Sequence, residues 1–179
     1  MHKLGLIGKN ISHSKSKQMY EEILGQEVNY KLFDYEKVKD LPTLEELFTQ
    51  VNGISITSPY KKSYNQMVKI IGEVRELGII NCIRNTGNGF EATNTDFLAV
   101  ENFLKNTELL KERQIVLLGN GSMSEITKFY TEKNNIKLVQ LSRTSNKNFE
   151  ELSLKKLQEN IGKDLLIINA CSREYQSSG

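Results

Sequence analysis

The chain has 179 residues, of which 38% are hydrophobic and 26% charged, and its formal net charge is +2. These values are typical of a globular protein with a modest core, and so small a net charge argues against a surface for nucleic acid or anionic membrane. No stretch approaches the length of a transmembrane helix or of the apolar region of a signal peptide. Its two cysteines lie in apolar surroundings, as expected for reduced thiols in a cytoplasmic protein.

The first half of the chain alternates between strand and helix patterns, which predicts a sheet with parallel crossovers. We expect strands at residues 3–7, 28–33, 52–57, 79–84 and 90–93. We expect helices at residues 15–24, 41–50, 60–71 and 96–110. Met19 and Ile23 should face inward on the first helix, with Tyr20 as a further candidate, and the glycines of residues 86–89 predict a hairpin turn before the last of these strands.

The loop after the first predicted strand, residues 10–17, has the sequence NISHSKSK. Three hydroxyls, one imidazole and two ammonium groups lie within these eight residues, and two interpretations are open. Ser12, Ser14 or Ser16 could cap the following helix. Alternatively, the hydroxyls and the helix N-terminus together bind a carboxylate or a phosphate.

The organisation restarts near Lys111. Residues 115–118 form a continuous apolar run typical of a buried parallel strand, and further strands are expected at 137–141 and 164–168. A glycine turn and an amphipathic helix follow the first run, which is the opening of a dinucleotide-binding fold. Gly119 permits the sharp turn and Gly121 lets the backbone approach a pyrophosphate, whereas Ser124 replaces the third glycine. A purely structural glycine turn is the alternative.

The residues after the second of these strands indicate which dinucleotide would bind. A protein that prefers NAD ends this strand with an acidic residue, which accepts a hydrogen bond from the ribose 2′-hydroxyl. Here the strand is followed by Ser142, Arg143, Thr144 and Lys147, and no carboxylate appears before Glu150. Two cationic groups and two hydroxyls suit a 2′-phosphate, so NADP is expected; an exposed polar turn is the alternative.

The chain resembles the shikimate dehydrogenases. The segments NISHSKS, SITSPYKK, INCI and NTD, the glycine turn and SRTSNK occur in the order and spacing of that family. The resemblance implies an α/β substrate-binding domain at 1–96, a linking helix at 97–111 and a Rossmann-type NADP-binding domain at 112–179. It also implies reversible, NADPH-dependent reduction of 3-dehydroshikimate to shikimate in aromatic amino-acid biosynthesis, by a cytoplasmic monomer or homodimer without metal.

The resemblance also assigns roles to individual residues. Ser14 and Ser16 match the serines that bind the substrate carboxylate, and the other substrate contacts implied are Ser55, Thr57, Lys61, Asn81 and Asp96. The cofactor contacts implied are Gly119, Asn120, Gly121, Ser122, Ser142, Arg143, Thr144, Lys147 and Ala170. Lys61 and Asp96 match the catalytic pair, and we expect them to transfer the proton together, with Lys61 the direct partner. A solvated Lys61, and an Asp96 that caps a helix with Thr95, are the alternatives.

Several positions depart from the family pattern. Ser55 stands in place of an asparagine, Cys82 in place of a threonine, and Phe97 and Ala99 in place of glycines, so that Phe97 is expected to narrow the cleft. Only about three strands follow Lys111, and the family's later elements are not found, so we expect a Rossmann-type domain that is incomplete and a chain that turns over poorly. A quinate or amino-shikimate dehydrogenase, and a non-catalytic relative that binds a small acid or a nucleotide, are the alternative functions.

Overall fold

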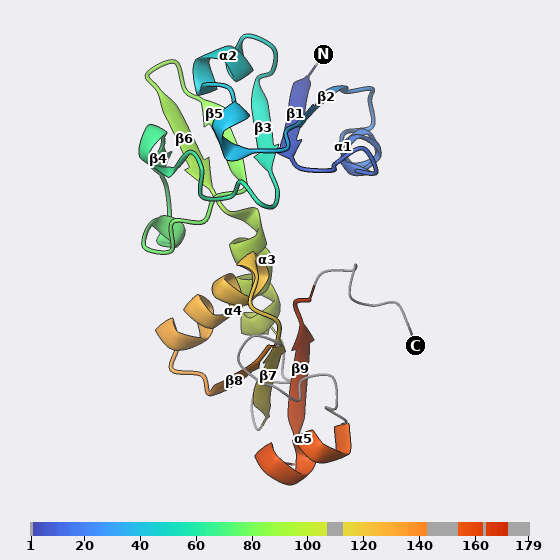
Figure 1. The fold of residues 1–179 in the computed structure, drawn as a ribbon, viewed down its shortest axis with the longest axis vertical. Coiled ribbons are helices and arrows are strands. Elements are labelled where there is room, and N and C mark those ends of the chain that lie inside the picture. The colour runs from blue at the N-terminus through green and yellow to red at the C-terminus, as the bar shows by residue number, and fades with distance from the viewer. Residues whose placement is uncertain (1, 107–112, 143–153, 163, 172–179) are drawn as a thin grey trace. The chain divides into compact units, whose positions relative to one another are not determined.

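The computed structural model describes residues 2–106, 113–142, 154–162 and 164–171. The chain divides into two compact units, Met1–Thr95 and Asp96–Gly179 (Figure 1). Among the described residues, no helix has both the length and the hydropathy that crossing a bilayer requires.

The first unit is built on a six-stranded mixed sheet with the order β2-β1-β3-β5-β6-β4. Its strands are β1 Lys3–Gly8, β2 Asn29–Asp34, β3 Gly53–Ile56, β4 Lys69–Ile70, β5 Cys82–Asn85 and β6 Phe90–Thr93. Strand β1 pairs in parallel with β2 and β3, as the alternating pattern predicts, but β5 is antiparallel to both β3 and β6. The expectation of parallel crossovers throughout is therefore wrong for β5.

The reason lies in the segment between β3 and β5. The predicted helix at 60–71 does not form; residues 65–67 make a short 3-10 turn, and β4 pairs with β6. Tyr60 and Tyr64 are buried there because their hydroxyls donate to the carbonyls of Tyr35 and Pro42, at 2.6 and 3.0 Å. The chain enters the sheet as β4, which runs parallel to β6 and therefore to β3, and it returns as β5 in the opposite direction.

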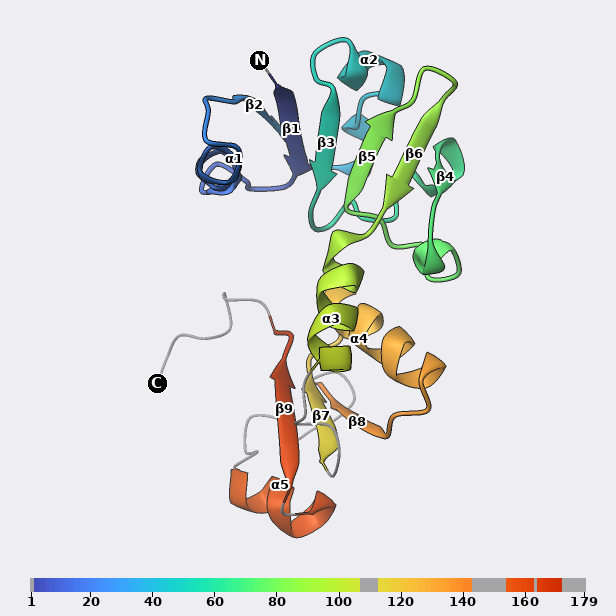
Figure 2. The ribbon, with the colours of Figure 1, turned by 180° about the vertical axis from the view of Figure 1, so that it is seen from behind.

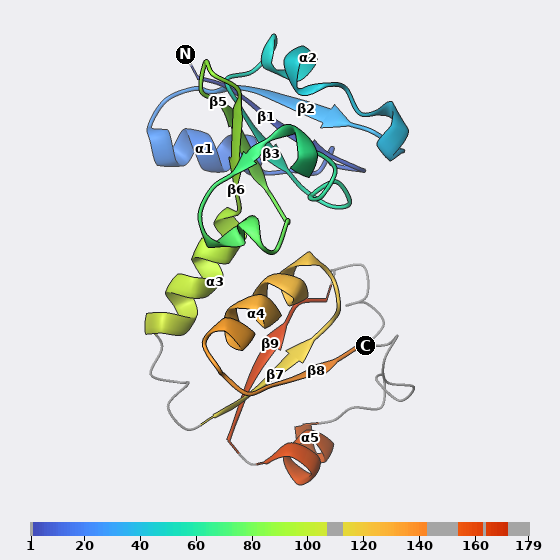
Figure 3. The ribbon, with the colours of Figure 1, turned by 90° about the vertical axis from the view of Figure 1, so that its left-hand side faces the viewer.

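The two helices of the first unit are α1 Ser16–Leu24 and α2 Leu44–Phe48, and they lie on opposite faces of the sheet (Figure 3). The main core lies on the α2 side, where Leu44 and Leu47 pack with alternate residues of β3. The inward orientation expected for Met19 and Ile23 is wrong, since these side chains are 57% and 75% exposed. Helix α1 directs Tyr20, the further inward candidate, toward Ser55 of the sheet.

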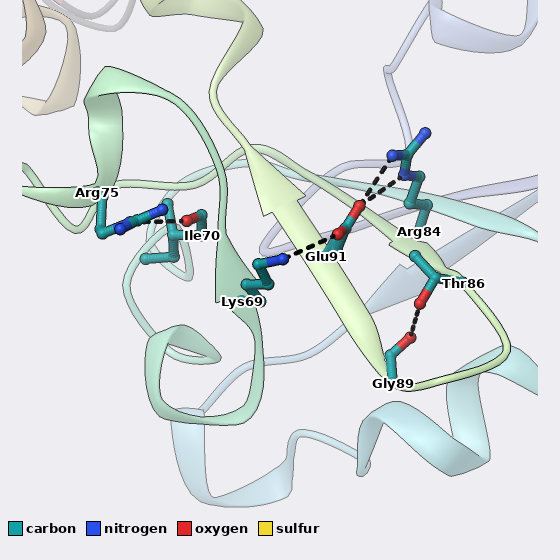
Figure 4. Close-up of polar contacts among 7 residues, drawn as sticks. All are labelled: Lys69, Ile70, Arg75, Arg84, Thr86, Gly89 and Glu91. Atoms are coloured by element: carbon teal, nitrogen blue, oxygen red, sulfur yellow. Dashed lines mark hydrogen bonds and ion pairs between the residues drawn. The ribbon is translucent and has the colours of Figure 1, made fainter.

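Strands β5 and β6 form the hairpin that the glycine turn predicts (Figure 4). The Thr86 hydroxyl donates to the Gly89 carbonyl at 3.0 Å and closes the turn. Across the pair, Glu91 accepts a hydrogen bond from the Arg84 guanidinium at 2.8 Å and forms an ion pair with Lys69 of β4 at 3.7 Å. The hydrogen bond from Arg84 lowers the pKa of Glu91, so the carboxylate links three strands.

The second unit holds a parallel three-stranded sheet with the order β8-β7-β9 (Figure 2). Its strands are β7 Gln114–Leu118, β8 Leu138–Leu141 and β9 Leu165–Asn169, and its helices are α3 Thr95–Asn106, α4 Ser122–Lys133 and α5 Leu154–Ile161. Ile115, Val116 and Leu117 of β7 are fully buried, as their continuous apolar run predicts. Helix α5 was not among the predicted elements.

Candidate functional site

The predicted substrate residues of the first unit lie near one end of its strands, where β1, β2 and β3 finish and β5 starts. The parallel register aligns Gly8 with Asp34 and Ile7 with Ile56, so β1, β2 and β3 end together. The antiparallel register aligns Ser55 with Cys82, so β5 begins at the same edge. The predicted contacts on or directly beyond this edge are Ser14, Ser16, Ser55, Thr57, Lys61 and Asn81.

The loop after β1 is held in place by Asp34 of β2. The Asp34 carboxylate accepts hydrogen bonds from the backbone amides of Asn10 and Ile11, at 2.8 and 2.9 Å. Asn10 adopts a left-handed conformation with φ of 54°, which turns both amides toward that carboxylate. Gly8 is required before the loop, because a Cβ there would lie 2.5 Å from the methyl groups of Ile11 and Thr57. Asp34 was missed in the sequence, although an acidic residue at the end of a strand was the available signal.

The serine loop leads directly into α1. The Ser14 hydroxyl accepts a hydrogen bond from the Ser16 amide at 3.2 Å, and the two serine hydroxyls lie 3.0 Å apart. The N-cap residue is Lys15, whose own side chain forms no capping hydrogen bond. The serines therefore do not occupy the N-cap position, and the helix terminus with two adjacent hydroxyls is suited to an anion.

Two tyrosines that the sequence analysis missed join these serines. The Tyr20 hydroxyl of α1 lies 3.3 Å from the Ser55 hydroxyl of β3, and the rings of Tyr20 and Tyr30 are 5.8 Å apart. The Tyr30 hydroxyl is buried, and it forms no hydrogen bond of normal geometry among the described residues. Burial raises the pKa of Tyr30, whereas the neighbouring Ser16 and Ser55 hydroxyls lower it by a smaller amount.

Asn81 fixes the start of α3. Its side-chain oxygen accepts from the Thr95 amide at 2.8 Å, and its amide group donates to the Thr95 hydroxyl at 2.9 Å. Helix α3 already begins at Thr95, so Asp96 lies within the first turn and is not the capping residue. Lys61, whose carbonyl accepts from the Ile80 amide at 2.9 Å, belongs to the first unit and Asp96 to the second. Their pairing stays a prediction.

The structure shows the surroundings of Cys82 and Phe97, two residues that depart from the family pattern. Cys82 pairs with Ser55 across β3 and β5, and burial raises the pKa of its thiol, so the thiol is protonated at neutral pH. The Phe97 ring is 1% exposed and packs 5.8 Å from the ring of Phe129, in the core of the second unit. Phe97 therefore packs against α4, and its expected effect on a cleft stays a prediction.

The glycine turn of the second unit lies at the end of β7, between the ends of β8 and β9. The Gly119 amide donates to the Leu141 carbonyl at 2.8 Å, and the Ala170 amide donates to the Leu118 carbonyl at 2.8 Å. Gly119 has φ of 113°, and a Cβ on it would lie 2.9 Å from the Ala170 carbonyl oxygen, so only glycine fits. Since β7 connects to neighbours on both sides, this turn is the switch point of the sheet, where ligands bind in such folds.

The space around the turn fits a pyrophosphate. Nothing described lies within 4 Å of the position of a Cβ on Gly121, the N-cap residue of α4, so a ligand can approach the backbone closely. Asn120 and Ser122 flank Gly121, and Ser142, at the end of β8, is buried. Arg143, Thr144 and Lys147 lie outside the described residues.

An apolar cavity of about 380 Å³ extends from Ala170 along α3 and α4, lined by residues that include Val100, Phe103, Met123 and Ile168.

These features define a class of protein: an α/β domain with a serine loop beside the ends of its parallel strands, followed by a Rossmann-type domain. Comparison with known proteins narrows the class. Residues 6–83 match the family model of the shikimate dehydrogenase substrate binding domain. These residues therefore belong to the shikimate dehydrogenase substrate binding domain family, and the chain as a whole is similar to shikimate dehydrogenases.

Individual relatives agree with this assignment. The chain is 29% identical over 143 residues to the shikimate dehydrogenase (NADP(+)) of Clostridium beijerinckii. The aligned region covers 76% of this chain and 53% of the relative. It is 30% identical over 181 residues to that of Prochlorococcus marinus, with 97% and 61% covered. The chain thus spans about half the length of the first of these relatives.

Solved structures share the fold. A chorismate mutase/shikimate 5-dehydrogenase fusion protein from Clostridium acetobutylicum superimposes with a TM-score of 0.74 at 25% identity, covering 96% of this chain and 67% of the other. A shikimate 5-dehydrogenase from Thermus thermophilus, in complex with NADP(H) and shikimate, superimposes with a TM-score of 0.70 at 20% identity, covering 96% and 69%. At 20% identity, the similarity to the second structure shows a shared fold alone.

Proposed function

We propose that the protein is an NADP(H)-dependent oxidoreductase that reversibly reduces 3-dehydroshikimate to shikimate in aromatic amino-acid biosynthesis. The observation that carries the proposal is the pair of sites: a serine loop at a helix terminus in the first unit and a glycine turn at the switch point of the second. Both occur in the family order, and the chain is similar to shikimate dehydrogenases over most of its length. It acts on these small molecules in the cytoplasm, as a monomer or homodimer.

In this proposal the first unit holds the acid. Ser14 and Ser16 donate to the substrate carboxylate beside the N-terminus of α1, where the helix dipole favours negative charge. Asp34 keeps their loop in position through the Asn10 and Ile11 amides. Thr57 and Asn81 contact the ring hydroxyls from the ends of β3 and the start of β5.

The second unit holds NADP, which supplies or accepts the hydride when bound. Gly119 and Gly121 shape the turn, and the Ser122 end of α4 directs backbone amides toward the pyrophosphate. Asn120 and Ala170 line the same turn. Ser142, Arg143, Thr144 and Lys147 bind the 2′-phosphate, since cationic groups and hydroxyls suit it and no carboxylate lies among them.

Lys61 and Asp96 move the proton. Reduction of a ketone requires a proton to arrive at the oxygen that becomes the hydroxyl, and oxidation requires the same proton to leave. An ammonium group can donate this proton, and a nearby carboxylate keeps the ammonium oriented. We therefore assign the direct transfer to Lys61, with Asp96 as its partner.

A substitution of Lys61 tests the assignment. Lys61→Ala should lower kcat for NADPH oxidation by 3-dehydroshikimate about 10²- to 10⁴-fold, because general acid–base groups contribute on this scale. The shikimate Kd should change less than about tenfold, since the serine loop still binds the acid. Lys62→Ala is the matched control, because this adjacent lysine is exposed, and it should retain activity.

The possible results separate the candidate functions. A parent protein that is inactive with shikimate, quinate and both nicotinamide cofactors would contradict the dehydrogenase proposal and favour a non-catalytic binding protein. The presence of Ser55 in place of an asparagine favours one other candidate, a quinate or amino-shikimate dehydrogenase. A kcat/KM higher for quinate than for shikimate would support that candidate.

A further inference from the structure

Five hydroxyl groups meet where α1 lies on the sheet. Ser14 lies in the loop before α1, Ser16 is the first residue of α1, and Tyr20 follows one turn later on the same helix. Tyr30 of β2 and Ser55 of β3 complete the group, with the Tyr20 and Ser55 oxygens 3.3 Å apart and the Ser14 and Ser16 oxygens 3.0 Å apart. We call these five side chains the hydroxyl cluster.

The cluster lies on the face of the sheet opposite the main core. Ile54 and Ile56, the neighbours of Ser55 in β3, are 2% exposed and pack in the core with Leu44 and Leu47. Side chains alternate along a strand, so Ser55 points to the other face, toward α1. The cluster therefore lies beside the serine loop and apart from the hydrophobic interior.

Tyr30 is the unusual member. Its hydroxyl is buried but forms no hydrogen bond of normal geometry among the described residues, although Ser16 and Ser55 are near enough to affect its pKa. An unsatisfied buried hydroxyl costs stability, and a phenylalanine would fill the same space without that cost. A bound oxygen atom at the serine loop would give this hydroxyl its acceptor.

Tyr20 plays a different part. Its contact with Ser55 fixes a short side chain whose hydroxyl would otherwise rotate freely. A hydroxyl oriented before binding loses less entropy on binding than a free one. Tyr20 can therefore act on a ligand through Ser55.

We propose that Tyr30 binds the substrate acid directly, by donating a hydrogen bond to its carboxylate, and that Tyr20 is a positioning residue that orients Ser55. This inference rests on the proposed function and adds two specificity-determining residues to it. A carboxylate has about four acceptor sites, and Ser14 and Ser16 use two of them. Tyr30 supplies a third donor, and its raised pKa keeps the phenol protonated across neutral pH.

The test begins with Tyr30→Phe, with shikimate binding measured by calorimetry and stability by thermal unfolding. Affinity should fall about tenfold or more, because a hydrogen bond to a charged group is lost. The Tm should stay the same or rise, because an unsatisfied buried hydroxyl is removed. Tyr64→Phe is the matched control: its hydroxyl donates to the Pro42 carbonyl on the core side, so its Tm should fall while affinity is unchanged.

The positioning role of Tyr20 is tested by a double-mutant cycle with Ser55→Ala. Each single change, Tyr20→Phe or Ser55→Ala, should weaken shikimate binding about twofold to tenfold. The double variant should bind no worse than Ser55→Ala alone, because Tyr20 acts through that hydroxyl. Additive losses would contradict the positioning role.

The outcomes distinguish this inference from the proposed function. If the parent binds shikimate and Tyr30→Phe binds equally well, the role of Tyr30 is overturned while the proposed function stands. If Tyr30→Phe loses both affinity and Tm, Tyr30 is structural and the inference is again overturned. If the parent binds neither shikimate nor quinate, the proposed function and this inference fail together.

Discussion

Asp34 shows how a residue outside the predicted contacts supports the conformation of the serine loop. Its carboxylate accepts from two consecutive amides of a loop that lies 23 and 24 residues earlier in the sequence. Without it these amides would have to bond to water, and the left-handed turn at Asn10 would lose its support. The position of Ser14 and Ser16 therefore depends on β2 as well as on their own loop.

Asp34→Ala should lower the free energy of unfolding by about 1 kcal/mol, since Asp34 is exposed and its hydrogen bonds are discounted for solvent screening. Shikimate affinity should also fall, because the serine loop loses its support. Denaturant unfolding and calorimetric titration measure the two effects. Asp40→Ala, at another exposed carboxylate of the first unit, should leave affinity unchanged. Equal affinity in Asp34→Ala and the parent would show that the loop holds its shape unaided.

Residues of the site could be predicted where they lie close together in the sequence. Ser14 and Ser16 share one loop with a helix start, and Gly119 and Gly121 share one turn, so local patterns suffice to predict them as site residues. Asp34, Tyr20 and Tyr30 reach the same place through strand pairing and helix packing, and no local pattern predicts that proximity. The sequence offered only weak indications of them: Asp34 is an acidic residue at the end of a predicted strand, Tyr20 follows Ser16 by one helical turn, and Tyr30 lies in the next predicted strand.

At the scale of elements, the β5–β6 hairpin links its strands through charge as well as through the backbone. Because the Arg84 guanidinium lowers the pKa of Glu91, the folded state favours the carboxylate. The resulting stabilisation is fully present above the ordinary glutamate pKa, and it is lost as pH falls through the lowered value of the folded state. Acid should therefore weaken this part of the sheet.

Glu91→Gln should remove that contribution. The parent's Tm should fall from pH 5 toward pH 3 more steeply than the Tm of the variant, because only the parent loses the Glu91 interaction with Arg84 and Lys69. Thermal unfolding across this range provides the measurement. Glu76→Gln, at an exposed carboxylate elsewhere in the first unit, should keep the parent's slope. Parallel curves for the parent and Glu91→Gln would contradict the role of this hydrogen bond.

Most elements were predictable, and the failures have a common cause. The periodicity of apolar residues identifies an apolar face, but it does not show which tertiary contacts that face makes. Tyr60 and Tyr64 follow helical spacing, yet their hydroxyls donate to distant carbonyls and residues 60–71 form no α-helix. Met19 and Ile23 follow it too, but α1 contacts the sheet through Tyr20. Tertiary contacts overrode local pattern in both places.

At the scale of the whole molecule, the sequence predicted an α/β chain in which a Rossmann-type fold follows a substrate domain, and the similar structures agree with that class. The compact units meet between Thr95 and Asp96, close to the expected boundary. The reversal of β5 was not predictable, because it depends on β4, a two-residue strand that no periodic pattern indicates. The cofactor residues Arg143, Thr144 and Lys147 remain predictions from the sequence.

The central claim is that the first unit binds a small acid at the serine loop, and calorimetric titration of the chain with shikimate tests it most directly. The parent should show one saturable site. Ser14→Ala and Ser16→Ala should each bind about tenfold to a hundredfold more weakly, because each loses a hydrogen bond to a charged group worth roughly 1.5–3 kcal/mol. Ser12→Ala, an exposed serine of the same loop, should bind as the parent does, and NADP affinity should be unchanged in all variants. A parent that binds no shikimate, or serine variants that lose NADP binding while shikimate binding is intact, would contradict the account.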